Sequence, residues 1–326
     1  MTQKTTMLRL MAGLAAFGGA AAMDAAAQTY PVKPVKLVVG FTPGGVADAI
    51  ARLLAQHMSP LLGQSVVVEN RGGASGAIAY DMVAKSPPDG YTLLIVGATA
   101  AVLPAIRKSL PYDLVRDLTG VGMVAIAPFV LTLHPSVPAK NVKELIALAR
   151  SRPGGMSYGS VGAGSPPHLM GELFNLMAGT KIEHIPYKGG GDNAIANASG
   201  QIEMSYLSVP SLLPLLSGNR LRPLAVTGAK RSASMPNLPT IDEAGLPGYD
   251  YSNWNGVVTS TGTPKDVIAK LNGIMVKVLA TAELRDALTK QGLDTQSSTA
   301  DQLQTFIRGE VEKNAKLIKT IGMKAE

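Results

Sequence analysis

Two glycine-rich segments have the residue types that bind a small anion. The first covers residues 41–48, with the sequence FTPGGVAD, and lies between a predicted strand and a predicted helix. Gly44 and Gly45 lack a Cβ, so backbone N–H groups can approach a ligand, and the N-terminus of the following helix carries a partial positive charge. The segment is not a nucleotide P-loop, because no Gly-Lys-Ser/Thr follows and no G-x-G-x-x-G occurs. The alternative interpretation is a glycine turn in which Asp48 supports the first helical turn.

The second segment covers residues 159–168, with the sequence GSVGAGSPPH, and again lies between a predicted strand and a predicted helix. Ser165 is predicted to be the N-cap of that helix, because a proline follows it at the first helical position. Gly162 and Gly164 leave the backbone open to a ligand, and Ser160 and Ser165 add hydroxyl groups. We therefore expect this segment to hold a small ligand as well.

An exported hydrolase or isomerase that uses Ser160 or Ser165 as its nucleophile is the alternative function. A nucleophile elbow has the pattern G-x-S-x-G, and Tyr158 takes the place of its first glycine around Ser160. No general base can be placed within reach of either serine from the sequence, so binding is favoured over catalysis. His168 lies in the first turn of the predicted helix, where it either contacts the ligand or caps the turn.

Alternating strands and helices must position these two segments. The predicted strands and helices before residue 121 follow a βαβαβ order, which indicates a parallel sheet with helices on its faces. The predicted strands cover residues 35–40, 66–69, 91–96, 156–159, 182–186 and 221–227, and the predicted helices 50–61, 74–84, 141–150, 165–177, 192–199 and two more that begin at residues 264 and 299. The pattern restarts after the apolar run 121–133, so the chain is predicted to be an α/β protein with two units.

The division of the chain follows from where this pattern restarts. We expect residues 28–127 and 248–326 to form one lobe and residues 128–247 to form the other. Ligands of open α/β sheets lie beyond the carboxyl ends of the strands. The two glycine-rich segments leave strands at those ends, so a ligand cleft between the lobes is predicted.

The first 27 residues have the pattern of a cleaved secretion signal. Lys4 and Arg9 precede an apolar run over residues 10–23, and three alanines at 25–27 fit the A-x-A rule of signal peptidase. No later segment has the length and apolarity of a transmembrane helix. The mature chain is therefore predicted to be a soluble protein of the periplasm.

Composition excludes several classes of protein. The 326 residues contain 16% charged and 46% hydrophobic residues, unlike a disordered chain, and no cysteine, which excludes disulfides, thiolate catalysis and cysteine metal sites. The four histidines never have the i, i+4 spacing of two ligands on one helix, so neither a metal nor a cofactor is expected. The formal net charge is +7, but the basic residues are scattered, which argues against nucleic acid as a partner.

The chain resembles the Bug/TctC family of periplasmic solute-binding proteins, which are associated with tripartite tricarboxylate transporters. The resemblance covers the whole mature chain, and its specificity comes from many modest motifs in one order. They include YPVKPVKLVVGFTPGG at 30–45, VVVENRGGASG at 66–76, PPDGYTLL at 87–94, LPYDLVRDL at 110–118, SYGSVGAGSPPHLMGELF at 157–174, HIPYKGGGDN at 184–193, LAVTGAKR at 224–231, LPTIDEAGLPGY at 238–249 and GTPKDVIAKLN at 262–272.

This resemblance implies a two-lobed, type II-like "Venus flytrap" that binds a small mono-, di- or tricarboxylate between its lobes. It implies a non-catalytic, monomeric protein that delivers its ligand to a membrane transporter or sensor. The family holds the proximal carboxylate with the two strand-to-helix segments. By position, these residues are Thr42, Gly44, Gly45, Val46, Ala47 and Asp48 from one lobe, and Ser160, Gly162, Ala163, Gly164, Ser165 and His168 from the other.

Five further residues are candidates for the lining of the cleft. Ala98 and Thr99 end a predicted strand, although Thr99 also suits a helix cap. Tyr187 and Lys188 follow another strand, and Lys188 is either the cation for a second carboxylate or an exposed lysine. Tyr206 either walls the distal pocket or packs in the core.

The chain departs from its relatives at two places that bear on the ligand. Thr42 stands where many relatives have a second proline, which adds a hydroxyl donor. Leu207 and Ser208 stand where relatives commonly have Asp-Asn. We therefore expect a distal pocket bounded by Leu207, Tyr206 and Ala98, without an acid to match the ammonium of an amino acid.

Overall fold

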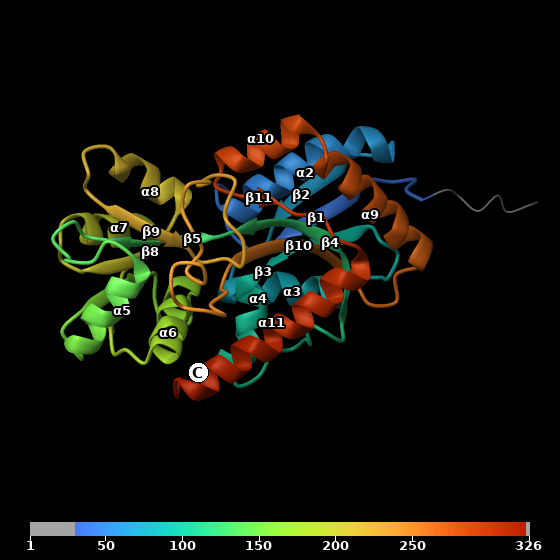
Figure 1. Ribbon diagram of the computed structural model, residues 1–326. Helices are drawn as coiled ribbons and strands as arrows, with labels where there is room; N and C mark the ends of the chain where they lie inside the picture. Colours follow the sequence, from blue (N-terminus) through green and yellow to red (C-terminus); the bar gives the residue numbers. More distant parts are fainter. Residues whose placement is uncertain (1–29, 324–326) are drawn as a thin grey trace, which may run out of the picture. The chain divides into compact units, whose positions relative to one another are not determined.

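The structure is a computed structural model that describes residues 30–323, and the signal prediction for residues 1–27 lies outside them. The chain divides into residues 1–32 and residues 33–326, and the second unit contains all the helices and strands described below. This unit has two β-sheets, each flanked by helices (Figure 1). No helix within residues 30–323 is both long enough and apolar enough to cross a membrane.

The first sheet has six strands in the order β11-β4-β10-β3-β1-β2. Its strands are β1 (Val35–Val39), β2 (Val66–Asn70), β3 (Thr92–Gly97), β4 (Leu118–Ala127), β10 (Asn253–Ser260) and β11 (Asp294–Thr295). Strand β1 pairs in parallel with β2 and β3, which confirms the predicted βαβαβ order. Its helices are α2 (Val46–Leu62), α3 (Ala77–Ala84) after the 3-10 turn η1 (Ala74–Gly76), α4 (Ala98–Ile106), α9 (Lys265–Leu279), α10 (Ala282–Lys290) and α11 (Ala300–Thr320).

The second sheet has five strands in the order β7-β6-β8-β5-β9. Its strands are β5 (Phe129–Leu133), β6 (Ser157–Ser160), β7 (Glu183–Pro186), β8 (Met204–Ser208) and β9 (Arg222–Val226). The helices that follow its strands are α5 (Val142–Ser151), α6 (Pro166–Ala178), α7 (Gly190–Ala198) and α8 (Val209–Leu216). Helix α5 agrees with the predicted helix over residues 141–150, and its N-cap residue Asn141 accepts a hydrogen bond from the Glu144 backbone N–H.

The expectation of a parallel sheet needs a correction in both halves. Strand β10 is antiparallel to β3 and β4, and β5 is antiparallel to β8 and β9. The apolar run 121–133 is two strands in two different sheets, separated at Pro128, which has no backbone N–H to donate to a ladder. An antiparallel strand that is buried on both faces has the same apolar pattern as a parallel one, so the sequence did not separate them.

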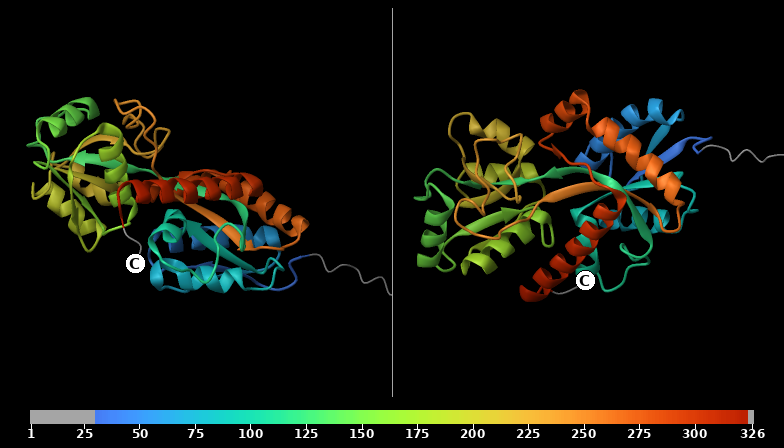
Figure 2. Two further views of the ribbon diagram at one scale, coloured as in Figure 1. Left: turned by 90° about the horizontal axis from the view of Figure 1, so that it is seen from below. Right: turned by 45° about the vertical axis from the view of Figure 1, so that its right-hand side comes forward.

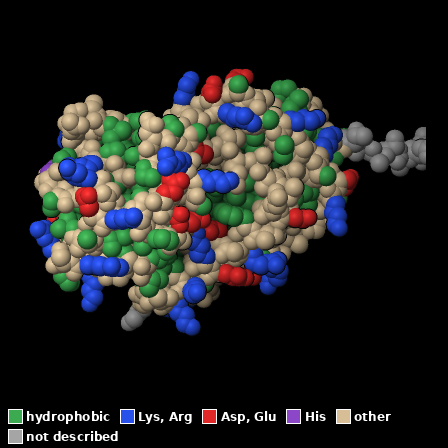
Figure 3. Space-filling view, in the orientation of Figure 1, with side chains coloured by type: hydrophobic (Ala, Val, Ile, Leu, Met, Phe, Trp, Pro, Cys, Tyr) green, Lys and Arg blue, Asp and Glu red, His purple; other side chains and the backbone are tan. Residues whose placement is uncertain are grey.

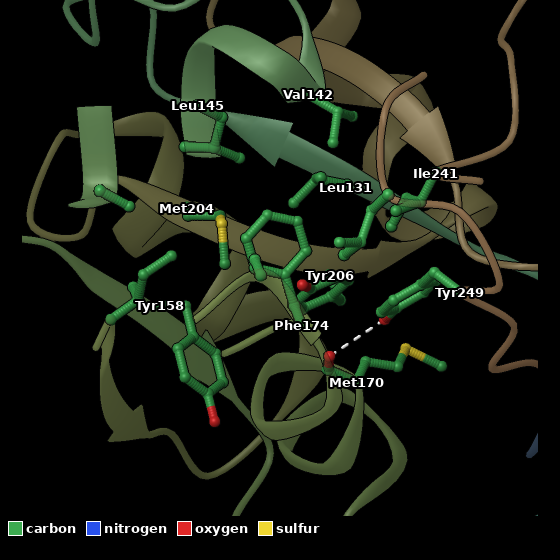
Figure 4. Packing of buried hydrophobic residues seen from close by; sticks show 14 of the residues in the cluster. Leu131, Val142, Leu145, Tyr158, Met170, Phe174, Met204, Tyr206, Ile241 and Tyr249 are labelled. Atoms are coloured by element: carbon green, nitrogen blue, oxygen red, sulfur yellow. Dashed lines mark hydrogen bonds between the residues drawn. The ribbon is translucent and has the colours of Figure 1, made fainter. Parts of the chain in front are cut away.

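The core of the second sheet is rich in aromatic side chains (Figure 4). Tyr158, Phe174 and Tyr206 pack together there, and the Tyr249 hydroxyl donates a hydrogen bond to the Met170 carbonyl oxygen at 3.0 Å. Each such side chain contributes roughly 1.5–3 kcal/mol or more through apolar burial. This packing holds α6 against β6 and thereby fixes the segment that joins them.

The last helix, α11, contacts elements of both sheets. It packs along α4 and β4, and its end also contacts α6 (Figures 1 and 2). Leu317 and Ile318 belong to the hydrophobic core of the second sheet. The Tyr251 hydroxyl, in the segment that returns the chain to β10, donates a hydrogen bond to Asn314 Oδ1 at 2.8 Å. Thus α11 ties the two halves together beside the crossing strands.

Candidate functional site

A cavity of about 330 Å³ lies at the carboxyl ends of β1 and β3. It is the position that open α/β sheets use for ligands. The structure brings together here six of the residues that the sequence nominated, namely Thr42, Gly45, Val46, Ala47, Ala98 and Thr99. None of the described residues that line this cavity is Asp, Glu, Lys or Arg.

Two helix N-termini meet at this cavity. Helix α2 begins after Gly45 and helix α4 after Gly97, and both glycines have extended backbones. Neither helix has a side-chain hydrogen bond at its N-cap. The first N–H groups of both helices therefore have no capping side chain, and the partial positive charges of two helix dipoles add at one place. This arrangement suits an anion such as a carboxylate.

Asp48 supports the first segment and is not among the residues that line the cavity. Its Oδ2 accepts hydrogen bonds from the Gly44 backbone N–H at 3.0 Å and from Arg52 Nε at 2.9 Å. Its Oδ1 accepts one from Asn70 Nδ2 at 3.0 Å. The bond from Arg52 is the main reason that the pKa of Asp48 is lowered to about 2. These bonds fit the alternative interpretation of Asp48, as support for the first helical turn.

Gly44 forms the turn that Asp48 supports, because its backbone N–H donates a hydrogen bond to Asp48 Oδ2. Its φ of +88° lies in the left-handed region, which favours glycine. Gly44 is therefore required by the turn, and it is not among the residues that line the cavity.

The second segment is built on two stacked histidines. Ser160 Oγ lies 2.6 Å from His184 Nε2 and accepts a hydrogen bond from the Gly162 N–H at 3.0 Å. The Gly164 N–H donates to His168 Nδ1 at 3.0 Å. The two imidazole rings are stacked with their centroids 4.0 Å apart. Both rings thus hold the backbone of the segment, and His168 has the capping role that was the alternative to ligand contact.

The electrostatics of the pair keep both rings neutral near pH 7. Burial is the main cause that lowers the pKa of His184 to about 4, and the neighbouring His168 adds to the effect. Burial also lowers the pKa of His168. Glu172 accepts a hydrogen bond from the Tyr158 hydroxyl at 2.7 Å and lies 3.9 Å from His168 Nε2.

Ser165 occupies the predicted N-cap position of α6, but its hydroxyl donates to the Gly162 carbonyl oxygen at 2.6 Å and makes no cap bond. Ala163 is exposed. None of residues 160–168 lines the cavity at α2 and α4. The structure therefore places the two segments in separate settings, and the second contributes no wall to this cavity.

His184 is the base that sequence reasoning did not find for the serine-hydrolase alternative. Ser160 is fully buried, and its Oγ also accepts a hydrogen bond from the Gly162 N–H. Glu172 lies too far from His168 Nε2, at 3.9 Å, for a hydrogen bond that would orient the ring. The geometry is that of a structural support for the loop.

Comparisons with known proteins place the chain in a family. The family described as "Tripartite tricarboxylate transporter family receptor" matches residues 50–323. The chain belongs to this family. The Bug/TctC resemblance is thereby confirmed, and so is the two-lobed α/β fold of solute-binding proteins.

Individual relatives cover nearly the whole receptor. BugT of Bordetella pertussis is 36% identical over 322 residues, which are 98% of this chain and 99% of that protein. The structure titled R. palustris Rpa4515 with adipate is 36% identical with a TM-score of 0.75, and covers 91% of this chain and 100% of its own. The structure of MatC from Rhodopseudomonas palustris with bound malate is 28% identical with a TM-score of 0.70, and covers 89% and 100%.

Two residues that were expected to bound the receptor's distal pocket are buried in the structure. Tyr206 is 1% exposed in the core of the second sheet, and Leu207 is 1% exposed in a separate apolar cluster with Val130. They are successive residues of β8, so they point to opposite faces of the sheet, and both faces are covered. Of the other two candidates, Tyr187 is half-buried and Lys188 is exposed.

Sequence reasoning missed the contribution of β10 to the receptor's cavity. Asn253 and Asn255 line it from this strand, and Tyr80 lines it from α3. The signal that could have found the asparagines is their i, i+2 spacing around Trp254, which places both on one face of a strand.

A larger cavity of about 500 Å³ lies elsewhere in the receptor and is lined by Trp254 and Phe306. Several of its charged groups are already paired, as in the 3.1 Å contact of Lys313 Nζ with Glu310 Oε1. Figure 3 shows acidic and basic side chains intermixed over the face that it draws, without a large patch of one sign. The two uncapped helix N-termini make the smaller cavity the candidate site.

Proposed function

We propose that this receptor captures a small organic carboxylate at the cavity between α2 and α4 and delivers it to a tripartite tricarboxylate-type transporter or a sensor. The single observation that carries this proposal is the meeting of two uncapped helix N-termini at one cavity. The adipate and malate in the titles of related structures agree with a carboxylate ligand.

The second lobe completes the site in this proposal. Lobe boundaries at residues 127 and 248 agree with the sheets, because the first sheet stops at Ala127 and resumes at Asn253. Residues 160–168 lead into the N-terminus of α6, whose helix dipole favours an anion, and closure of the lobes would bring this end of the helix to the ligand.

The receptor acts in the periplasm as a monomer in this proposal, after removal of residues 1–27. It performs no catalysis. Ser160, the candidate nucleophile, supports this view because it is buried and serves the loop backbone.

Titration calorimetry with adipate and with malate tests the proposal. We expect one carboxylate to bind each chain, and ligand at about 100 times its Kd should stabilise the fold by roughly 2.7 kcal/mol in a thermal-shift assay. Native mass spectrometry of protein purified without added ligand extends the search to the carboxylates that the receptor carries. Absence of binding across a panel of mono-, di- and tricarboxylates would reject the proposal.

A further inference from the structure

Two side chains that line the candidate cavity, Tyr80 and Asn255, have a buried donor without a partner among the described residues. Asn255 lines the cavity and is only 5% exposed. Its Nδ2 has no hydrogen-bond partner among the described residues. A buried amide donor without a partner costs free energy, so this group needs an explanation.

The backbone around Asn255 is arranged to admit its side chain. Asn255 pairs with Gly97 across the β10–β3 ladder, and Gly97 is also the N-cap residue of α4. A Cβ on Gly97 would lie 2.7 Å from the Trp254 carbonyl oxygen and 3.3 Å from Asn255 Oδ1. A glycine at this position therefore lets the amide lie beside the uncapped N-terminus of α4.

We propose that Asn255 is a ligand-binding residue whose side-chain N–H donates to the carboxylate held at the N-termini of α2 and α4, and that this cavity selects carboxylates without a neighbouring ammonium group. The inference rests on the proposed function and names its ligand class more narrowly. A carboxylate oxygen is the acceptor that an unpartnered amide and two helix N-termini share.

The selection against ammonium follows from the lining. No Asp or Glu is among the described residues that line the cavity. The carboxylate oxygens of nearby Asp48 already accept hydrogen bonds from Gly44, Arg52 and Asn70. An α-ammonium group would lose its water without gaining an acceptor of opposite charge. The sequence pointed to Leu207 as the cause of this selection. In the structure the cause is the absence of an acidic side chain from the described lining of the cavity.

A leucine at position 255 separates a ligand role from a structural role. Asn255→Leu keeps the side-chain size and removes the unpartnered amide, so the unliganded protein should unfold at the same or a higher temperature. Its affinity for adipate or malate, whichever the wild type binds more tightly, should fall about ten-fold or more.

The matched control is Asn272→Leu, since Asn272 is an asparagine whose amide has partners. Its Nδ2 donates to the carbonyl oxygens of Val121 and Ser298, and none of these three residues lines the cavity. This control should unfold at a lower temperature and keep the wild-type affinity. A lower unfolding temperature for Asn255→Leu with unchanged affinity would overturn the proposal.

A second variant tests the ligand class. Asn255→Asp supplies the missing acid, so it should weaken binding of the dicarboxylate and raise the affinity for L-aspartate relative to it. The wild type should bind L-aspartate at least ten-fold more weakly than the dicarboxylate; tighter binding of L-aspartate would overturn the selection. If the wild type binds no carboxylate at all, the proposed function fails, whereas wild-type binding that Asn255→Leu leaves intact refutes only this inference.

Discussion

At the scale of single residues, one carboxylate organises the first glycine-rich segment. Asp48 joins the turn at Gly44, the next helical turn at Arg52 and the neighbouring strand at Asn70. A substitution that removes this carboxylate would leave the three donors with poorer hydrogen-bond partners. The turn would then no longer be held in the position that orients the N-terminus of α2.

We predict that Asp48→Asn lowers the free energy of unfolding by about 1–2 kcal/mol at pH 7, measured by urea denaturation. The folded-state pKa of Asp48 is lowered from 3.8 to about 2, so its contribution is present above pH 3.8 and is lost as the pH falls through 2. The gap between wild type and variant should close over that range. A gap that stays constant with pH would show that the charge is not involved.

The stacked histidines predict a second pH dependence. The pKa of His184 in the fold is about 4, below the ordinary 6.5, so the unfolded chain binds the proton first as the pH falls. Wild-type stability should therefore decrease between pH 6.5 and 4. In His184→Gln, which keeps a hydrogen-bonding group beside Ser160, the decrease should be smaller, as thermal unfolding at a series of pH values would show. Equal slopes would contradict this account.

For Asp48 and Ser160, the sequence predicted the position in the fold better than the role of the side chain. Asp48 was placed in the correct segment, but its oxygens are consumed partly by Asn70, on another strand. Likewise, Ser160 was singled out, and its partner His184 lies on β7, next to β6 in the sheet. Such roles depend on pairing between strands, which local sequence does not specify.

At the scale of elements, the N-terminus of α2 is the part that the ligand is expected to touch. Gly45 has a φ of −84°, and a Cβ there would meet only the Thr42 carbonyl oxygen, at 4.0 Å. Gly44, with its φ of +88°, is strained by any side chain.

We therefore predict that Gly45→Val unfolds within a few degrees of the wild type but loses most of its carboxylate affinity, because the side chain obstructs the approach to the helix N–H groups. Gly44→Val should instead lower the unfolding temperature. Calorimetry and thermal unfolding of both variants make the comparison. Full affinity in Gly45→Val would remove α2 from the site.

The sequence predicted some elements well and missed others. Strands β1, β2, β3 and helix α11 were found, and α11 begins with the capping box at Thr299 and Gln302. Strands β8 and β10 were not found. Strand β8 has the sequence MSYLS, which lacks the apolar run that marks β1 as VKLVV, although four of five residues are buried in both strands.

At the scale of the whole molecule, two lobes that contact one ligand should close on it. The closed state gains free energy only when the ligand bridges both lobes. We predict that saturating carboxylate reduces the radius of gyration measured by small-angle X-ray scattering. The Gly45→Val variant under the same conditions is the control, and an unchanged wild-type profile would indicate a rigid, preformed site.

The position of Trp254 gives the receptor an optical probe of its own. It is the only tryptophan of the chain and is 1% exposed in β10. Its ring packs edge-on against that of Phe306, with the two ring centroids 5.3 Å apart. Its neighbour in the strand is Asn255, on the side of the candidate site. Tryptophan fluorescence, excited selectively over that of the nine tyrosines, therefore comes from one indole at the crossing between the lobes, and stopped-flow recording of its emission would time ligand capture without any label.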